Sequence, residues 1–127
     1  MLQVSQKGGF KKTEKLLLGS KKKMQNIRKI LDRYGVMGVD ALSRATPIRT
    51  GLTARSWTYT IEINQWGYDI AWINENENQG ANVAILIQYG HGTRTGGYVQ
   101  GTDYINPAMK PIFDKMATDI AKEVSSL

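Results

Sequence analysis

Several residue types on which common functional sites depend are scarce or missing. Among the 127 residues there is no Cys and a single His, His91. Without Cys, the chain can form no disulfide, thiolate zinc site or Cys nucleophile. With one His, it can form no multi-histidine metal site, and a histidine-based catalytic site would have to centre on His91. The apolar runs are also short, far below the ~20 residues that a membrane-spanning helix needs.

The N-terminal segment, residues 1–15, lacks the apolar core and the small-residue cleavage site of a signal peptide. We therefore expect a soluble protein that is made inside the cell. A chain of this length is typical of one domain, which buries roughly two-thirds of its unfolded surface and needs no disulfides. We expect a single domain over residues 1–127, with residues 1–9 flexible because they end in two glycines.

Charge is divided unevenly along the chain. Residues 1–55 hold 13 Lys and Arg against 3 Asp and Glu, a net +10, whereas residues 56–127 hold 4 against 8, a net −4. Such asymmetry favours either binding to nucleic acid or head-to-tail attraction between copies, which can close into a ring. The alternative is that the basic residues, with Lys21, Lys22 and Lys23 among them, form only a solvated helix face.

Two stretches show the apolar spacing of amphipathic helices. Over residues 21–45, apolar side chains recur at intervals of three, four or seven, and Pro47 disfavours helical geometry beyond that point. Gly35 and Gly38 either weaken this helix, by about 1 kcal/mol each relative to Ala, or allow close packing. A second apolar face begins near Pro107, which suits the first position of a helix.

The middle of the chain has the patterns of β-strands. Residues 57–63 alternate between apolar and polar, residues 64–67 have the composition of a turn, and residues 68–73 form a second candidate strand. Residues 81–87 are nearly all apolar, which predicts a strand covered on both faces. The short connections favour antiparallel pairing. The sequence therefore predicts an α+β domain, with an antiparallel sheet of three to five strands packed by a long helix in the N-terminal half and a C-terminal helix.

The aromatic residues of the strands have two interpretations. A row of exposed rings on a sheet can stack on nucleic-acid bases. The alternation instead places Trp57, Tyr59 and Trp72 on the buried side, whereas Trp66 lies in the turn and is expected to be exposed. Core packing is therefore the better account of the first three.

Residues 88–103 form the longest stretch without a regular pattern. They contain five of the 13 glycines of the chain. A long glycine-rich loop in a small domain is often functional or mobile. We expect Tyr98 and Val99 to form a short strand inside this loop.

Catalytic motifs are not evident in the chain. His91 stands in a Gly-His-Gly segment of the loop, where packing or hydrogen bonding at an interface is the simpler interpretation. Residues 90–97 are glycine-rich but lack the Gly-Lys-Ser/Thr ending of a phosphate-binding loop. Glu75 and Glu77 have the spacing of neighbours on one strand face, but a solvated turn explains them better. We therefore expect no enzymatic activity, no cofactor and no metal, and we favour an assembly or interaction protein.

Four segments stand out in order along the chain: Ala45-Thr-Pro-Ile-Arg-Thr-Gly-Leu52, Ala84-Ile-Leu-Ile-Gln-Tyr-Gly-His-Gly-Thr93, Gly96-Gly-Tyr-Val-Gln-Gly101 and Ile105-Asn-Pro-Ala108. Together they resemble one family, the tail completion or head–tail joining proteins of long-tailed bacteriophages and prophages. The match extends over about residues 10–125. Gln88 stands where an acidic residue is common in this family, and the residue usually found between Gly51 and Leu52 is missing.

The resemblance implies a virion structural protein without catalytic activity. Proteins of this family are typically monomers before assembly and then form a ring, commonly hexameric, at the head–tail junction around the channel that DNA crosses. The implied partners are further copies of the chain, the adjacent neck and tail proteins and genomic DNA in the channel, with no membrane. The implied location is the virion and, during assembly, the host cytoplasm.

The resemblance and the glycine-rich loop together point to three sets of residues. Thr50, Gly51 and Leu52 are expected to shape a loop that positions the first strand of the hairpin. The lysines at 21–23 are candidates for charge contacts between subunits. The loop is expected to be mobile in the free protein and ordered by neighbouring subunits. The residues expected at the subunit interface are Tyr89, Gly90, His91, Gly92, Thr93, Arg94, Thr95, Gly96, Gly97 and Tyr98.

Two other functions stay open from the sequence. One is a small basic nucleic-acid-binding protein that uses residues 7–33, with an affinity that falls steeply as salt rises. The other is an enzyme centred on His91. Arg94 suits either a carboxylate or a phosphate partner, or is a solvated loop residue.

Overall fold

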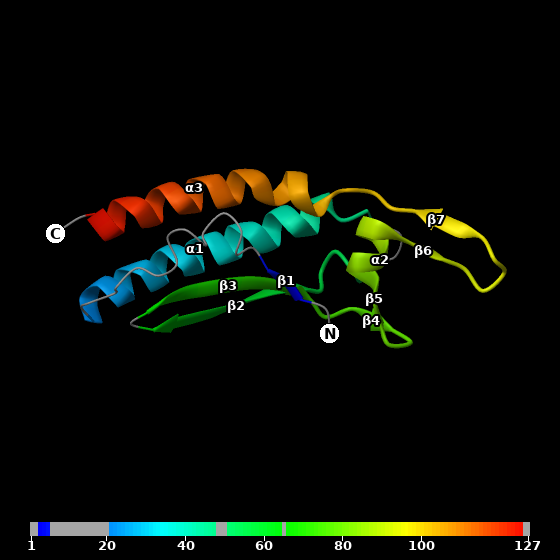
Figure 1. Ribbon diagram of the computed structural model, residues 1–127, viewed down its shortest axis with the longest axis horizontal. Helices are drawn as coiled ribbons and strands as arrows, with labels where there is room; N and C mark the ends of the chain where they lie inside the picture. Colours follow the sequence, from blue (N-terminus) through cyan, green and yellow to red (C-terminus); the bar gives the residue numbers. More distant parts are fainter. Residues whose placement is uncertain (1–2, 6–20, 48–50, 65, 126–127) are drawn as a thin grey trace.

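The computed structural model describes residues 3–5, 21–47, 51–64 and 66–125 (Figure 1). The predicted α+β class is confirmed, with a long helix in the N-terminal half and a C-terminal helix. Of residues 1–9, expected to be flexible, three pair as a strand and the rest lie outside the described residues. The elements follow in the order β1 (Gln3–Ser5), α1 (Lys21–Ala45), β2 (Trp57–Asn64), β3 (Gly67–Asn74), β4 (Glu77–Asn78), β5 (Ala81–Asn82), α2 (Val83–Tyr89), β6 (Gly90–Gly92), β7 (Tyr98–Gln100) and α3 (Ile105–Ser125).

The main sheet is antiparallel, with strands in the order β1-β3-β2. β2 and β3 form the predicted hairpin, paired from Trp57 opposite Asn74 to Asn64 opposite Gly67. β1 pairs with the other edge of β3, with Val4 opposite Trp72. Two smaller pairs, β4 with β5 and β6 with β7, lie beyond one end of this sheet (Figure 1).

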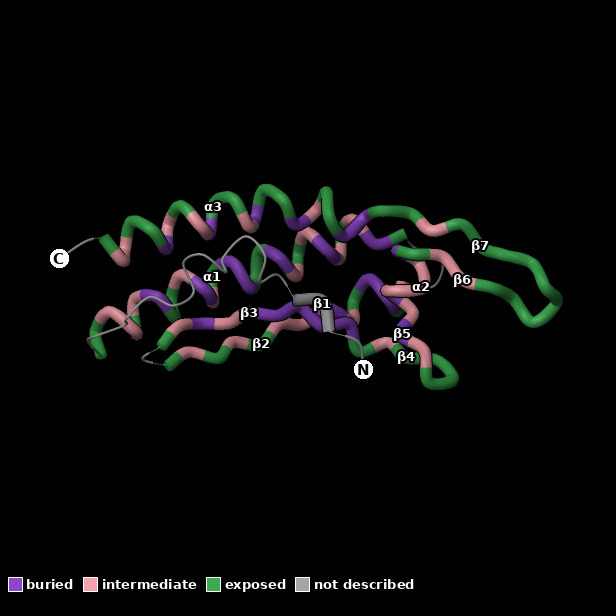
Figure 2. Tube along the Cα trace, viewed as in Figure 1, coloured by how far each residue is buried: buried purple, intermediate pink, exposed green. Residues whose placement is uncertain are grey.

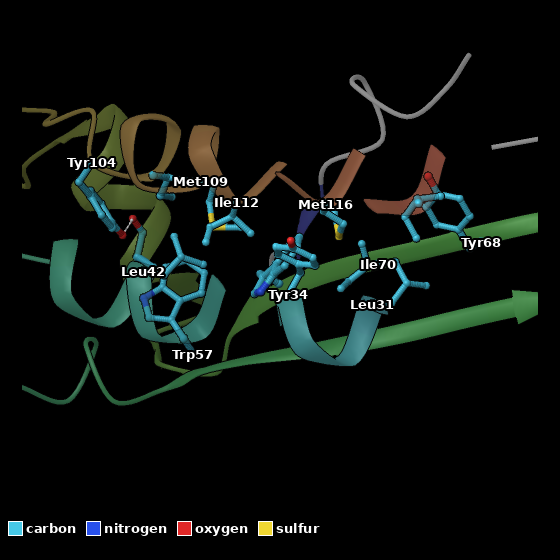
Figure 3. Packing of buried hydrophobic residues seen from close by; sticks show 14 of the residues in the cluster. Leu31, Tyr34, Leu42, Trp57, Tyr68, Ile70, Tyr104, Met109, Ile112 and Met116 are labelled. Carbon is cyan, nitrogen blue, oxygen red and sulfur yellow. Dashed lines mark hydrogen bonds between the residues drawn. The ribbon is translucent and has the colours of Figure 1, made fainter. Parts of the chain in front are cut away.

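One helix covers the sheet and the second lies along the first. α1 packs against β2 and β3, and α3 runs beside α1 in the opposite direction (Figure 1). Figure 3 shows the buried side chains that these elements bring together, from Tyr104 and Leu42 at one end to Leu31 and Tyr68 at the other. The ring of Phe113 on α3 lies 5.7 Å from that of Trp72 on β3, so α3 also reaches the sheet.

Two glycines allow α1 to approach the sheet closely. A Cβ atom at Gly35 would lie 2.4 Å from the ring of Tyr59, and one at Gly38 would lie 2.4 Å from Nε1 of Trp72. The Trp72 indole N–H donates a 3.0 Å hydrogen bond to the carbonyl of Gly35. The close-packing interpretation of these glycines is therefore confirmed. Trp57 and Trp72 are buried and Tyr59 is half-buried, whereas Trp66 is 64% exposed, as predicted.

Polar contacts join α1 to α3. The Tyr34 hydroxyl donates to Asp119, and the Arg33 guanidinium lies 2.8 Å from the same carboxylate. Nearer the start of α1 and the end of α3, Asn26 donates to Glu123 over 2.9 Å. Basic and acidic groups from the two halves of the sequence thus meet within one molecule, so part of the charge division serves the fold.

The prediction of a strand over residues 81–87 is wrong. Only Ala81 and Asn82 are in a strand, and Val83–Tyr89 forms α2. The Asn82 side chain caps this helix by accepting from the backbone N–H of Ile85 over 3.4 Å. Short apolar runs fit a buried strand or a short helix equally well. Here the N-cap and the burial of Ala84 and Gln88, four residues apart, show the helical alternative.

The C-terminal helix begins at Ile105, two residues before Pro107. Pro111 therefore lies in the second turn and not in the first, with its ring on the exposed side. The first backbone N–H groups of α3 have a side-chain acceptor, described below, so the helix starts without proline in its first position.

We expect Gly38→Ala to destabilise the protein. In an open helix this change adds about 1 kcal/mol of stability through helix propensity. Here the new methyl would overlap the Trp72 indole, and overpacking of this kind costs about 1–3 kcal/mol. The free energy of unfolding, measured in urea, should therefore fall. Val36→Ala, at an exposed position of the same helix, serves as the control, and a more stable Gly38→Ala protein would contradict the packing argument.

Candidate functional site

The segment expected to be a glycine-rich loop is a hairpin that projects from the molecule. Gly90–Gly92 pairs with Tyr98–Gln100, with His91 opposite Val99. The hairpin extends past the ends of both long helices (Figure 1), and residues 92–100 are all exposed (Figure 2). We refer to residues 89–101 as the arm. The long irregular loop over 88–103 is thus corrected to a helix end and a hairpin, and the short strand at Tyr98 and Val99 is confirmed.

A compact turn closes the tip of the arm. The backbone N–H of Thr93 donates to the carbonyl of Gly97 over 2.9 Å, and Gly96 donates back to the carbonyl of Thr93 over 3.2 Å. The Thr93 hydroxyl accepts from the backbone N–H of Gly97 over 3.0 Å. Gly96 has a φ of +85°, a conformation that L side chains rarely adopt. The tip is therefore closed by hydrogen bonds among its own residues.

At the root of the arm the two strands approach too closely for side chains. A Cβ atom at Gly90 would lie 2.5 Å from the carbonyl oxygen of Val99, and one at Gly101 would lie 2.5 Å from the carbonyl carbon of Tyr89. The Tyr98 hydroxyl donates to the Tyr89 carbonyl over 3.1 Å. The two glycines thus let the chain leave α2 and return toward α3 through one narrow junction.

Gln88 connects the arm to both helices that flank it. Its side-chain oxygen accepts from the backbone N–H groups of Tyr104 and Ile105, each over 3.0 Å, and so caps the start of α3. Its amide nitrogen donates to Asp103 over 2.7 Å. Gln88 is only 6% exposed, so these groups would have no water in place of the side chain. Both ends of the arm are fixed by this one residue.

Tyr104 adds a second link between the same helices. Its hydroxyl donates to the carbonyl of Ala84 in α2 over 2.8 Å, and its ring is buried. Burial raises the pKa of Tyr104 to about 12, and a hydrogen bond with Thr46 acts weakly in the opposite direction. The Thr102 backbone N–H donates to the carbonyl of Ile87 over 2.9 Å. The arm therefore projects from a well-bonded base.

The loop before β2 is positioned by a buried amide that the sequence did not single out. Asn74, fully buried, donates to the carbonyl of Thr53 over 2.8 Å and accepts from the backbone N–H of Asn76 over 2.9 Å. Asn82 in turn donates to the carbonyl of Asn74 over 2.8 Å. The only indication of this role in the sequence is an Asn at the end of an apolar strand, followed by more Asn residues.

Of the predicted loop-positioning residues, Thr50 lies outside the described part of the chain. Gly51 has a φ of +79°, and its carbonyl accepts from the backbone N–H of Arg55 over 3.2 Å. Leu52 is 44% exposed, and its carbonyl accepts from the Ser56 hydroxyl over 2.6 Å. These bonds hold the turn that leads into β2.

The three lysines proposed for charge contacts do not behave alike. Lys21 and Lys22 are exposed, whereas Lys23 is half-buried and its amine donates to the carbonyl of Val124 over 3.1 Å. They lie at the opposite end of the molecule from the arm (Figure 1). The structure therefore does not bring the arm and the lysines together into one site within a single copy.

His91 does not have the surroundings of a catalytic relay. Its ring is half-buried, and Nδ1 is buried without a hydrogen-bond partner. In a Ser–His–Asp relay, that nitrogen donates to a carboxylate. Within the described residues, no group of three His, Cys, Asp or Glu side chains could hold a metal ion.

The surface of the arm consists of aromatic and small residues with one charged residue, Arg94. The Arg94 guanidinium makes an exposed 3.4 Å hydrogen bond to Gln79.

The chain was compared with protein-family models, with characterised proteins and with solved structures, and none of them matches it significantly. Among the helices of the described residues, none has the length and apolar character required to cross a membrane.

We expect Gln88→Glu to weaken the base of the arm. A carboxylate can still accept from Tyr104 and Ile105, but it cannot donate to Asp103 and would bring two negative charges together. The cost should be about 1–3 kcal/mol in the free energy of unfolding at neutral pH. Adding Asp103→Asn should recover much of this loss, because the asparagine amide can donate to the new carboxylate. A double-mutant cycle by urea unfolding measures the coupling, and purely additive effects would contradict the contact.

Tyr104 should make stability fall at alkaline pH. Its folded pKa is about 12 and its unfolded value is about 10. Its contribution is therefore complete below pH 10 and is lost as pH rises toward 12. Below pH 10, Tyr104→Phe should be about 1 kcal/mol less stable, because it lacks the bond to Ala84. Between pH 10 and 12 this deficit should shrink or reverse, as measured by urea unfolding. Tyr89→Phe, which alters an exposed phenol, is the control, and a deficit independent of pH would refute the assignment.

Proposed function

We propose that this chain is a virion structural protein of a long-tailed bacteriophage or prophage, a tail completion or head–tail joining component that forms a ring at the neck. The observation that carries the proposal is the arm, an exposed hairpin whose base is hydrogen-bonded to the helices on both sides of it. An exposed arm of this kind suits contact with another protein surface.

The family resemblance adds support through where its segments lie. Three of the four segments that carry it meet at the base of the arm. The second and fourth are joined when Gln88 caps Ile105, and the third contains Gly101, whose backbone lies against Tyr89. Motif residues in this arrangement serve one structural purpose, which is to present the arm.

The proposed assembly is a ring of identical subunits, hexameric as is common in the family, that forms from monomers and binds the adjacent neck and tail proteins. The tip has its own hydrogen bonds, and we propose that the arm docks as a formed hairpin. A preformed arm loses less conformational entropy on docking than a mobile loop would.

Part of the basic segment considered for nucleic-acid binding makes contacts within the chain. Of the basic residues at 7–33, those at 7–15 lie outside the described residues. Lys23 and Arg33 have partners within the chain, and Arg28 lies 3.8 Å from Asp32. Lys21, Lys22 and Lys29 are exposed and are the described residues in this segment that we propose for contact with DNA in the channel.

Shortening the arm should abolish joining and leave the fold intact. Thr93–Gly97 is replaced by Asn-Gly, the preferred two-residue turn, between the paired residues Gly92 and Tyr98. Because residues 93–97 are exposed and, within the described part of the chain, bond only to one another and to Gln79, stability should change by about 0.5 kcal/mol or less. In a lysate of a phage lacking this gene and supplied with the variant, electron microscopy should show filled heads separate from finished tails.

The matched control is Thr60→Ala, an exposed change on the sheet, which should restore intact particles as the unaltered chain does. Intact infectious particles in the complete absence of this gene would overturn the proposed function. A large loss of thermal stability in the shortened variant would show instead that the arm belongs to the core.

A further inference from the structure

We propose that the arm of one copy docks on the outward face of α1 in a second copy, around Val36 and Met37. This inference rests on the proposed function, since it names the surface that receives the arm when subunits form the ring. The arm would contribute Tyr89, Tyr98 and Val99.

The two surfaces carry most of the exposed large apolar side chains of the described residues. On the arm, Tyr89 is 66%, Tyr98 65% and Val99 38% exposed. On α1, Val36 is 60% and Met37 37% exposed, although both lie in the middle of the most extensively packed helix. Adjacent exposed apolar residues on a helix that otherwise presents charges to solvent suggest a contact surface.

The arm cannot reach this helix face within its own molecule. It projects past the end of α1, in the direction away from the helix pair (Figure 1). A contact between arm and α1 must therefore join two copies through different surfaces. Such a heterologous contact closes into a ring when its rotation permits.

Charge on α1 does not oppose Arg94, because the arginines nearest to Val36 already have carboxylate partners: Arg28 lies beside Asp32, Arg33 beside Asp119 and Arg44 beside Asp40. Arg94 is the only charged side chain of the arm at neutral pH. On α1, Asp32 and Asp40 stand four residues before and after Val36, with side chains 47% and 58% exposed. Asp40 already lies 3.1 Å from Arg44, so an arriving guanidinium would join an existing ion pair at the rim of the contact.

The remaining exposed apolar positions fit the arm less well. Leu52 is next to Gly51, and the Arg55 guanidinium lies 3.3 Å from the position of a Cβ there, so Arg94 would meet a like charge that has no carboxylate partner among the described residues. Trp66 is a single exposed ring in the turn between β2 and β3.

The size of the contact agrees with a protein that is monomeric until it assembles. A fully buried Tyr contributes about 150–250 Å², so two partly exposed Tyr rings and Val99 supply a few hundred Å². A stable pair of proteins buries about 800 Å² on each partner. One such contact is therefore weak by itself, and it becomes persistent when each copy makes two of them in a closed ring.

The absence of Cys permits a direct test by disulfide trapping. We would prepare Val36→Cys and Val99→Cys separately, mix them at high protein concentration and oxidise the mixture. The proposal predicts a mixed dimer of the two variants, and a ladder of covalent oligomers from the chain that carries both substitutions. The control is Thr60→Cys mixed with Val99→Cys, since Thr60 is also exposed but lies on the sheet. Equal trapping with Thr60→Cys, or trapping of Val99→Cys only with itself, would overturn the proposed contact.

The unaltered chain is tested in parallel for head–tail joining, in the lysate of a phage that lacks this gene. Joining without a disulfide between positions 36 and 99 overturns this inference and leaves the proposed function standing. A specific disulfide in a protein that plays no part in joining retains the contact and overturns the function. Neither disulfide nor joining overturns both.

Discussion

The rest of the structure depends on how closely α1 can approach the sheet. At Gly35 and Gly38 the helix has no side chain, and the rings of Tyr59 and Trp72 occupy the space where Cβ atoms would stand. Burying a ring as large as that of Trp removes about 150–250 Å² from water, worth about 4–6 kcal/mol at ~25 cal/mol per Å². The indole N–H would be costly to bury alone, and the Gly35 carbonyl accepts it. With α1 fixed in this way, α3 packs beside it and the start of α3 has a defined place.

The base of the arm follows from that placement. α3 begins where Gln88 can reach its first backbone N–H groups, and Tyr104 reaches back to α2. A helix start leaves several N–H groups without partners inside the helix. Here the acceptor comes from Gln88, the residue just before the arm. The interaction that caps α3 therefore also fixes the base from which the arm projects. Core packing thereby determines the direction in which an exposed surface projects.

The spacing of apolar residues correctly predicted the helices and strands that bury one of their faces. The helix over residues 21–45 and the hairpin of β2 and β3 agree with their apolar spacing, because their burial is regular. Residues 81–87 were assigned wrongly because an apolar run has no period. Burial of Ala84 and Gln88 distinguishes the helix only in the folded molecule.

The sequence indicated where the candidate site lies along the chain, but not the secondary structure that it adopts. Glycine content identified residues 89–98, yet it suggested an irregular loop where Gly90 and Gly101 permit two strands to meet. Gln88 and Asn74 matter through long-range backbone partners, and no local pattern shows such partners. The sequence also could not show that Lys23 and Arg33 already have partners in α3.

A further consequence concerns evolution. The tip at residues 93–97 bonds mainly to itself, so insertions or exchanges there would leave the core unchanged. Sequence changes can therefore accumulate at this exposed tip while the packing of α1, α3 and the sheet stays as it is.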